Sequence, residues 1–500
     1  MNFISTRGEE RVTGAQAIVK GIASDGGLFV PETFPAVSAA EMEAMLGMDY
    51  PERAALVLHK YLDEYDKDEL LAALKKAYSQ FEEGDAAPLV RVENGMYMLE
   101  LFHGPTCAFK DMALTVLPYL LRKGCDLCGI QEEILILVAT SGDTGKAALE
   151  GFCNAPGIKV MVFYPDDGVS KMQKLQMCTQ EGDNVNVVAI KGNFDDCQTG
   201  VKKIFGSAEC AQKLKERGYL LSSANSINFG RLAPQIAYYF SAYCDLVSSD
   251  QIKMGDKVNF TVPTGNFGNI LAAYYAKQMG LPIGTLVCAS NKNNVLTDFW
   301  EKGVYNAKRE FYKTMSPSMD ILVSSNLERL IFELSGRDAA LTKERMTSLS
   351  ATGRYSIGAE ELKKYRSEFY AGYTNESDTV DCIYEFFEEY GYPMDTHTGV
   401  AMCVAQRYEE MVEQDTDAEK HPMVVVSTAS PYKFPQDVLY ALTGNDVKDS
   451  FKGIKRINLL TAMKVPESLK AIRYKTVRFK TTIAPEKMFD EVLNFVGKEA

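Results

Sequence analysis

The chain lacks the long apolar runs and the basic surface that two broad classes of protein require. None of its apolar runs approaches the ~20 residues that span a bilayer. Lys and Arg number 54 against 67 Asp and Glu, which gives a net charge of −13. A nucleic-acid-binding protein needs a basic face. We therefore expect neither a membrane nor a nucleic-acid partner, although an acidic protein can still carry a locally positive pocket for a small anion.

Targeting signals and metal-binding cysteine patterns are also missing. Residues 1–8 show no basic segment followed by an apolar one, so we expect a cytoplasmic protein. The eleven cysteines are odd in number and dispersed, which is typical of reduced thiols. Cys125 and Cys128 form a lone CxxC without a second pair. Since a metal site needs three or four ligands, we predict no metal.

Two further shortages limit the chemistry. No Gly-x-Gly-x-x-Gly follows a predicted strand, which argues against a dinucleotide-dependent oxidoreductase. Histidines number only four, and one of them, His397, stands in the polar cluster at 395–399. A lone histidine is more often a packed, hydrogen-bonded residue than a proton shuttle. The role of His397 stays open.

Hydrophobic periodicity divides the chain into four parts. Residues 1–85 are mostly helical, with amphipathic helices predicted at 39–48, 50–62 and 67–81. Residues 86–300 alternate between strands and helices, residues 301–380 read as a helical insertion, and residues 381–500 return to the α/β pattern with a strand at 423–427. We interpret these as an N-terminal domain, an α/β core, an insertion and a C-terminal return to the core.

Short apolar runs alternate with helical patterns in the core. Helices are expected at 146–153, 169–180, 194–217 (one long helix) and 269–279. The strands between them are expected at 134–139, 160–164, 185–190, 258–262 and 285–289. Continuous apolar strands that alternate with helices predict parallel sheets covered on both faces. Such sheets bind ligands at the carboxyl ends of their strands.

Two small-residue loops fall at those ends. One contains Ser141, Gly142, Asp143, Thr144 and Gly145; the other contains Gly265, Asn266, Phe267, Gly268 and Asn269. Each follows an apolar run and precedes a helix, so its N–H groups and the helix dipole favour a phosphate. An ordinary βα turn also uses Gly and Asn, and remains the alternative for each loop. Asp143 makes the first loop less inviting to an anion.

A lysine between apolar residues supplies the reactive group that such a site needs. Lys110 follows Ala108 and Phe109 and precedes Asp111 and Met112. A lysine that bonds to a carbonyl must be deprotonated, which burial favours. A surface lysine paired with Asp111 is the alternative, because isolated lysines are mostly exposed. Two phosphate-type loops and a buried amine together favour pyridoxal phosphate as the ligand.

A second polar group could bind an anionic substrate. Asn225 and Ser226 stand shortly before Arg231 between apolar flanks. The guanidinium of an arginine is a planar fork that matches a carboxylate or a phosphate.

Eight segments in this order resemble the threonine synthase family, in its longer type found in many bacteria and fungi. Their order and spacing across most of the chain is the specific signal. They are residues 5–8, 25–31, 103–111, 141–145, 265–269, 316–321 and 395–399, followed by 428–434 at the end.

The resemblance implies a fold and a reaction. The fold would be that of a fold-type II pyridoxal phosphate enzyme, similar to the tryptophan synthase β subunit, with two parallel-sheet domains, helices on both faces and a mostly helical N-terminal region. The reaction would be that of a carbon–oxygen lyase acting on phosphate. It would convert O-phospho-L-homoserine and water to L-threonine and phosphate by γ-elimination and β-addition of water, the last step of threonine biosynthesis.

The resemblance also assigns roles to residues. Lys110 would bind pyridoxal 5'-phosphate covalently and move the substrate's Cα proton. Gly265, Asn266, Phe267, Gly268 and Asn269 would grip the cofactor phosphate, Thr428 would bond to the pyridine nitrogen, and Asp143 would lie near the 3'-oxygen. Ser141, Thr144, Asn225, Ser226 and Arg231 would bind the carboxylate and phosphate of the substrate. The chain would act as a monomer or a homodimer.

Alternatives share parts of this pattern. A threonine synthase-like phospho-lyase would release 2-oxobutanoate, ammonia and phosphate with the same fold and cofactor. A serine or threonine dehydratase fits less well, because its sequence pattern does not include the N-terminal region 1–85 or residues 316–321. A non-catalytic protein on this scaffold is disfavoured by the intact Lys110 and the intact glycine loop.

Overall fold

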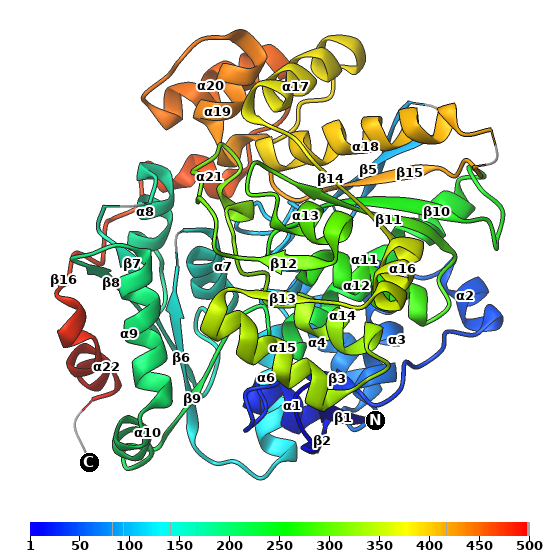
Figure 1. Cartoon of the computed structure of the whole chain (residues 1–500). Helices are drawn as coiled ribbons and strands as arrows, with labels where there is room; N and C mark the ends of the chain where they lie inside the picture. Colours follow the sequence, from blue (N-terminus) through cyan, green and yellow to red (C-terminus); the bar gives the residue numbers. More distant parts are fainter. Residues whose placement is uncertain (83, 94, 141, 168, 417, 498–500) are drawn as a thin grey trace.

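The computed structural model describes residues 1–500 except 83, 94, 141, 168, 417 and 498–500. Its larger sheet has six strands in the order β14-β11-β10-β15-β5-β4 (Figure 1). Neighbours are parallel except β4 and β5, which are antiparallel. The strands are β14 (Phe369–Tyr373), β11 (Ile283–Ser290), β10 (Val258–Pro263), β15 (Met423–Ser427), β5 (Met96–Glu100) and β4 (Leu89–Glu93).

A second sheet has five strands in the order β16-β8-β7-β6-β9, and all of its neighbours are parallel. The strands are β16 (Thr482–Ile483), β8 (Val185–Ile190), β7 (Ile158–Pro165), β6 (Glu133–Ala139) and β9 (Tyr219–Ser222). The predicted strands at 134–139, 160–164, 185–190, 258–262, 285–289 and 423–427 are confirmed by β6, β7, β8, β10, β11 and β15.

Helices cover both faces of the sheets, as predicted. In Figure 1, α18 (Thr396–Gln414) lies on one side of the larger sheet, and α11 (Phe229–Ser248) and α12 (Gly268–Gln278) lie on the other. Along β6 the side chains alternate between two cores. Ile134 and Ile136 belong to the core shared with α11, whereas Leu135 and Leu137 pack toward α9 (Phe194–Gly206) and α22 (Met488–Val496). This two-residue period explains why the strand is apolar throughout.

The N-terminal region combines helices with a small sheet. The helices α2 (Ala39–Met45), α3 (Tyr50–Tyr61) and α4 (Lys67–Tyr78) form where amphipathic patterns predicted them. Beside them, β2 (Arg11–Thr13), β1 (Asn2–Ser5) and β3 (Phe29–Pro31) pair antiparallel. Further helices in the first half are α1 (Gly14–Lys20), α5 (Asp111–Leu114), α6 (Leu117–Leu127), α7 (Asp143–Gly151) and α8 (Lys171–Cys178).

One predicted helix is wrong in its length. The segment 194–217 was expected as a single helix, but it breaks into α9 and α10 (Ala208–Lys215). Ser207 adopts an extended conformation between them, with φ −96° and ψ 115°, and its side chain accepts a hydrogen bond from Cys210 N. Serine favours this capping position because its side chain competes with the helical backbone for hydrogen bonds.

The segment 301–380, expected as a helical insertion, contains strands as well as helices. It contains η1 (Pro317–Met319), α14 (Leu327–Leu334), α15 (Ala339–Thr352) and α16 (Ala359–Glu368), but also β12 (Val304–Asn306), β13 (Arg354–Ser356) and β14. The aromatic run Phe369, Tyr370 and Tyr373 suits a strand, and β14 pairs with β11 at the edge of the larger sheet. The division of the chain into four domains stays a prediction.

The C-terminal part spans both sheets. After β14 come α17 (Glu376–Tyr390), α18, η2 (Pro431–Lys433), α19 (Pro435–Thr443), α20 (Ser450–Thr461) and α21 (Glu467–Ile472), and then β16, η3 (Pro485–Lys487) and α22. The remaining helix, α13 (Val295–Lys302), follows β11. β16 pairs with β8 of the smaller sheet. In the view of Figure 1, β16 and α22 lie at the left of the molecule and β15 lies at the right. Within the described residues, no helix has the length and apolarity to cross a membrane.

Candidate active site

The carboxyl ends of four strands supply the predicted site. Lys110 follows β5, Asp143 follows β6, Gly265 follows β10 and Thr428 follows β15. Two backbone hydrogen bonds join the first and last of these segments: Phe109 N donates to Thr428 O at 2.9 Å, and Ser430 N donates to Cys107 O at 3.1 Å. Lys110 and Thr428, 318 positions apart in the numbering, are thereby brought together at the sheet edge where parallel α/β folds bind ligands.

Lys110 is a buried amine at the start of α5. Its side chain is 11% exposed, and its Nζ lies 4.9 Å from the centre of the Phe109 ring. Burial lowers the pKa of Lys110, and the positive charges of Lys433 and Arg231 lower it further, against the opposing charge of Asp143. The neutral amine, which is the form that reacts with a carbonyl, is therefore more accessible than in a free lysine.

The alternative of a surface lysine paired with Asp111 is excluded by the geometry. Both carboxylate oxygens of Asp111 accept hydrogen bonds from Thr106, at 2.7 Å from the N–H and 2.6 Å from the hydroxyl. Asp111 is buried, and burial raises its pKa to about 6 despite these bonds. Asp111 thus fixes the turn before Lys110.

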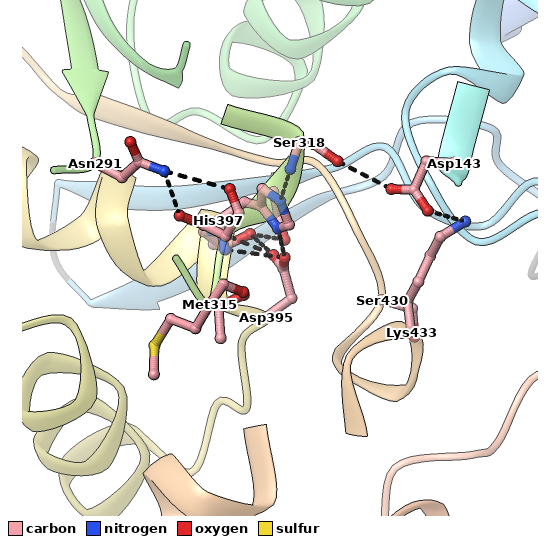
Figure 2. Close-up of polar contacts among 12 residues, drawn as sticks. Asp143, Asn291, Met315, Ser318, Asp395, His397, Ser430 and Lys433 are labelled. Carbon is pink, nitrogen blue, oxygen red and sulfur yellow. Dashed lines mark hydrogen bonds and ion pairs between the residues drawn. The ribbon is translucent and has the colours of Figure 1, made fainter. Parts of the chain in front are cut away.

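Asp143 is the centre of the charged part of the site (Figure 2). Its Oδ2 lies 3.7 Å from Lys110 Nζ and accepts a 3.0 Å hydrogen bond from Ser318 Oγ. Its Oδ1 lies 3.5 Å from Lys433 Nζ and accepts from Gln173 Nε2 at 3.2 Å. Burial alone would raise the pKa of Asp143, but the two lysines and the hydrogen bond from Gln173 hold that pKa well below its usual range. Asp143 is therefore an ionised carboxylate whose negative charge is offset by neighbouring lysines.

His397 is held between a carboxylate and a backbone amide. Its Nδ1 lies 2.6 Å from Asp395 Oδ2, and its Nε2 accepts a 3.1 Å hydrogen bond from Ser318 N. An Nε2 that accepts carries no proton, so these contacts assign the proton to Nδ1. Figure 2 shows Ser318 between His397 and Asp143, which it contacts through different atoms. His397 therefore orients η1, and this geometry gives it no direct contact with Lys110.

The second loop, between β10 and α12, has no charged side chain. Phe267 has a left-handed backbone with φ 63°, and the first N–H groups of α12 have no acceptor within the helix. Asn269 is buried; its Oδ1 accepts from the hydroxyls of Tyr238 and Tyr239, while its Nδ2 has no hydrogen-bond partner among the residues that the structure describes. A buried donor without a partner indicates a missing ligand or water.

Residues 316–326 close over this loop. Ser324 Oγ donates to Gly265 O at 2.6 Å, and Asn326 N donates to Asn266 O at 3.1 Å. A Cβ added to Gly265 would lie 3.1 Å from Ser318 O and 3.2 Å from Met319 Cα, both in the backbone. Glycine is therefore required for this close approach.

The predicted substrate residues are brought together only in part. Arg231 is buried in α11, donates from Nη1 to Ala224 O at 2.9 Å and leaves its Nε without a partner. Burial lowers the pKa of Arg231 to about 10. Asn225 is exposed, and Ser226 Oγ accepts from Asn326 Nδ2 at 3.5 Å. Thr144 is half-buried beside Asp143, and Ser141 lies outside the described residues.

Lys433, Ser318 and Gln173 are site residues that the sequence analysis did not identify. Lys433 and Ser318 stand inside segments 428–434 and 316–321, which carried the family resemblance. The position of Lys433 between Tyr432 and Phe434 could have indicated that it is buried, because a lysine with aromatic neighbours on both sides is unusual at a protein surface. Gln173, in an ordinary helix, gave no such signal.

The donors present fit pyridoxal phosphate. Lys110 supplies an amine whose neutral form is more accessible than in a free lysine, for bonding to a carbonyl carbon. Within the described part of the chain, Asn269 Nδ2 and Arg231 Nε are buried donors without partners, as an anionic ligand requires. The N-terminus of α12 adds free N–H groups.

Comparisons with known proteins agree along the chain. Three family models match: "Threonine synthase N terminus" at residues 2–78, "Pyridoxal-phosphate dependent enzyme" at 86–429 and "Threonine synthase, C-terminal" at 398–487. Threonine synthase-like 1 of Homo sapiens is 39% identical over 472 residues, covering 90% of this chain and 62% of that protein. The chain thus spans less than two thirds of that relative's length.

Two bacterial threonine synthases match over nearly their full lengths. The one from Pseudomonas aeruginosa is 37% identical over 440 residues, covering 88% of this chain and 90% of that protein. The X-ray structure of PLP-bound threonine synthase from Brucella melitensis has a TM-score of 0.87 and 36% identity, covering 99% of this chain and 98% of that chain.

Proposed function

The chain belongs to the threonine synthase family of pyridoxal-phosphate-dependent enzymes, and we propose that it converts O-phospho-L-homoserine and water to L-threonine and phosphate. The family resemblance and the fold-type II architecture expected from the sequence are confirmed. Pyridoxal 5'-phosphate is the cofactor of this family. Beyond family membership, we propose the substrate O-phospho-L-homoserine, action as a monomer or homodimer, and a cytoplasmic location.

One observation carries the proposal: Lys110, whose side chain is 11% exposed, faces the carboxylate of Asp143 between the carboxyl ends of β5 and β6, which belong to different sheets. When bound there, pyridoxal phosphate supplies an electron sink for negative charge at the Cα of an amino acid. Lys110 would hold the cofactor, and its amine, when it is not bonded to the cofactor, would accept and return protons at the substrate Cα. A lysine does this near neutral pH only when its ammonium form is disfavoured.

The two loops take different tasks in this proposal. Gly265, Asn266, Phe267, Gly268 and Asn269 hold the cofactor phosphate with N–H groups and the free amide of Asn269. Thr428 holds the pyridine nitrogen through its hydroxyl, and Asp143 stays beside the 3'-oxygen. A hydroxyl leaves that nitrogen largely unprotonated, which moderates the electron sink.

The substrate's two anionic groups need donors of their own. Arg231 is assigned to one of them because its Nε is buried and has no partner. Ser141, Thr144, Asn225 and Ser226 are assigned to the same anions. Phosphate leaves from Cγ before water adds at Cβ, so water must be excluded first and admitted later. The segment 316–326, which covers the second loop, is positioned to control that access.

The test follows three products from O-phospho-L-homoserine and the full chain: phosphate, threonine and 2-oxobutanoate. We expect equal phosphate and threonine, and a loss of ~1000-fold or more in Lys110→Ala, since the group that forms the covalent bond is removed. Lys174→Ala, which removes an exposed lysine, is the control. Phosphate with 2-oxobutanoate in place of threonine would assign the phospho-lyase reaction. Cofactor binding without turnover would contradict the assignment of O-phospho-L-homoserine as the substrate.

A further inference from the structure

Two buried lysines share the single carboxylate of Asp143. Lys433 Nζ lies 3.5 Å from Oδ1 and Lys110 Nζ lies 3.7 Å from Oδ2, and their side chains are 1% and 11% exposed. One carboxylate can neutralise only one ammonium. The protonation of Lys110 therefore depends on how Asp143 divides its charge between the two lysines.

The contacts of the two lysines are unequal. Lys433 Nζ donates a 2.7 Å hydrogen bond to Thr106 O in addition to its ion pair. Lys110 Nζ lies 3.7 Å from Asp143 and Lys433 Nζ is little closer at 3.5 Å, so the bond to Thr106 O is the difference between the two lysines. An ammonium needs several acceptors and a neutral amine does not. The geometry thus places the proton on Lys433.

The backbone around Lys433 fixes this arrangement. Lys433 ends η2, where its N–H donates to Ser430 O at 2.9 Å and Ser430 Oγ accepts from Tyr432 N. Its acceptor, Thr106, also donates twice to Asp111, which directly follows Lys110. One short chain of contacts therefore connects Lys433 to the turn that carries Lys110.

We propose that Lys433 is a positioning residue, which pairs with the negative charge of Asp143 and so leaves the Lys110 amine neutral and able to react. This inference rests on the proposed function, in which Lys110 is the lysine that bonds to the cofactor. Without Lys433, the full charge of Asp143 would face Lys110 and stabilise its ammonium form. The pKa of Lys110 would then rise.

The other charged or titratable groups around the pair do not replace this effect. Arg231 and Lys433 disfavour the ammonium of Lys110, whereas Asp143 and Asp111 favour it. His397 lies on the far side of Ser318 from Asp143, and Cys107, close to Lys433, keeps its proton because burial raises its pKa to about 11. Among these groups, only the two lysines form ion pairs with Asp143.

The experiment measures the reactivity of Lys110 without requiring turnover. The full chain, freed of cofactor, is mixed with pyridoxal 5'-phosphate between pH 6 and pH 10, and borohydride fixes the bond. The amine nitrogen attacks the aldehyde carbon with loss of water, and hydride reduces the resulting double bond. Mass analysis of the peptide containing Lys110 gives the rate, which follows the fraction of neutral amine.

We expect the midpoint of this pH profile to move upward by about one unit or more in Lys433→Met. Lys433→Arg, which keeps the charge, should remain near the wild-type midpoint. Lys146→Met is the matched control, because it removes another lysine with 11% exposure, on α7, that pairs with Glu150 instead. A Lys433→Met midpoint equal to that of the wild type would overturn the inference and assign Lys433 a structural role.

A double-variant cycle separates electrostatics from folding. Asp143→Asn should lower the midpoint, and Lys433→Met should raise it less in the Asp143→Asn background than in the wild type. The double variant removes both charges together and so keeps the test available if Lys433→Met alone does not fold. An upward shift as large without Asp143 as with it would contradict the inference. Absence of label on Lys110 in the wild type would instead contradict the proposed function.

Discussion

The loops 141–145 and 265–269 each connect a strand to a helix, but they differ in charge. The first carries the carboxylate of Asp143, and the second has no charged side chain. Each follows a parallel strand and opens a helix, β6 into α7 and β10 into α12. The first places Asp143 at its helix start, where two lysines, Ser318 and Gln173 contact the carboxylate. The second places Asn269 there, with a buried amide donor that lacks a partner.

The difference separates two tasks that one site must perform. A phosphate needs neutral or positive donors that are not already engaged, and the second loop provides them. A reactive lysine needs a balanced charge environment, and the first loop provides it through Asp143 and Lys433. In the proposed function, the same supersecondary unit would bind an anion in one loop and adjust the charge around an amine in the other, according to a single side chain near the start of its helix.

The largest expected effect comes from making the charged loop resemble the neutral one. Asp143→Asn keeps the shape but leaves Lys433 buried without its counter-charge, and breaking a buried pair in this way costs about 3–5 kcal/mol. Urea denaturation of the full chain without cofactor measures the loss. Asp143→Asn combined with Lys433→Met should recover part of it, because no unpaired charge remains. A loss below ~1 kcal/mol would mean that the pair is not energetically coupled.

The converse change makes the neutral loop resemble the charged one. Asn269→Asp removes the free amide donor and buries a carboxylate where we place the cofactor phosphate. Loss of a hydrogen bond to a charged group is worth about 2 kcal/mol, so the dissociation constant of pyridoxal phosphate should rise ~30-fold. Equilibrium dialysis measures it. Asn266→Asp, in the exposed part of the same loop, should have a smaller effect, and equal affinities in both variants would place the phosphate elsewhere.

The smallest expected effect compares two serines that hold the covering segment to the loops. Ser318 Oγ donates to the Asp143 carboxylate, whereas Ser324 Oγ donates to the neutral carbonyl of Gly265. A bond to a charged acceptor is worth about 2 kcal/mol and one to a neutral acceptor about 1 kcal/mol. Ser318→Ala should therefore lower the unfolding free energy more than Ser324→Ala. The reverse order would show that Asp143 finds a substitute donor.

Local pattern was sufficient for most of the fold. The strands β6, β8, β10, β11 and β15 were predicted within a few residues, because an apolar run between turn residues has few alternatives. The break at Ser207 was missed because a serine inside an apolar periodicity gives only a weak capping signal. The strand β14 was missed because its five residues form a strand by pairing with β11, from which more than 70 positions separate it.

The sequence by itself determined the fold class, the family, and Lys110 as a candidate reactive lysine directly after Ala108 and Phe109. These depend on local periodicity and on ordered motifs that a linear chain displays. Tertiary structure decided which charged groups surround Lys110. Lys433, from beyond residue 400, lies beside Asp143, and Ser318 contacts Asp143 from a third segment. Electrostatic effects on an amine fall with distance in space and not along the chain, so only the folded arrangement reveals which carboxylate is shared.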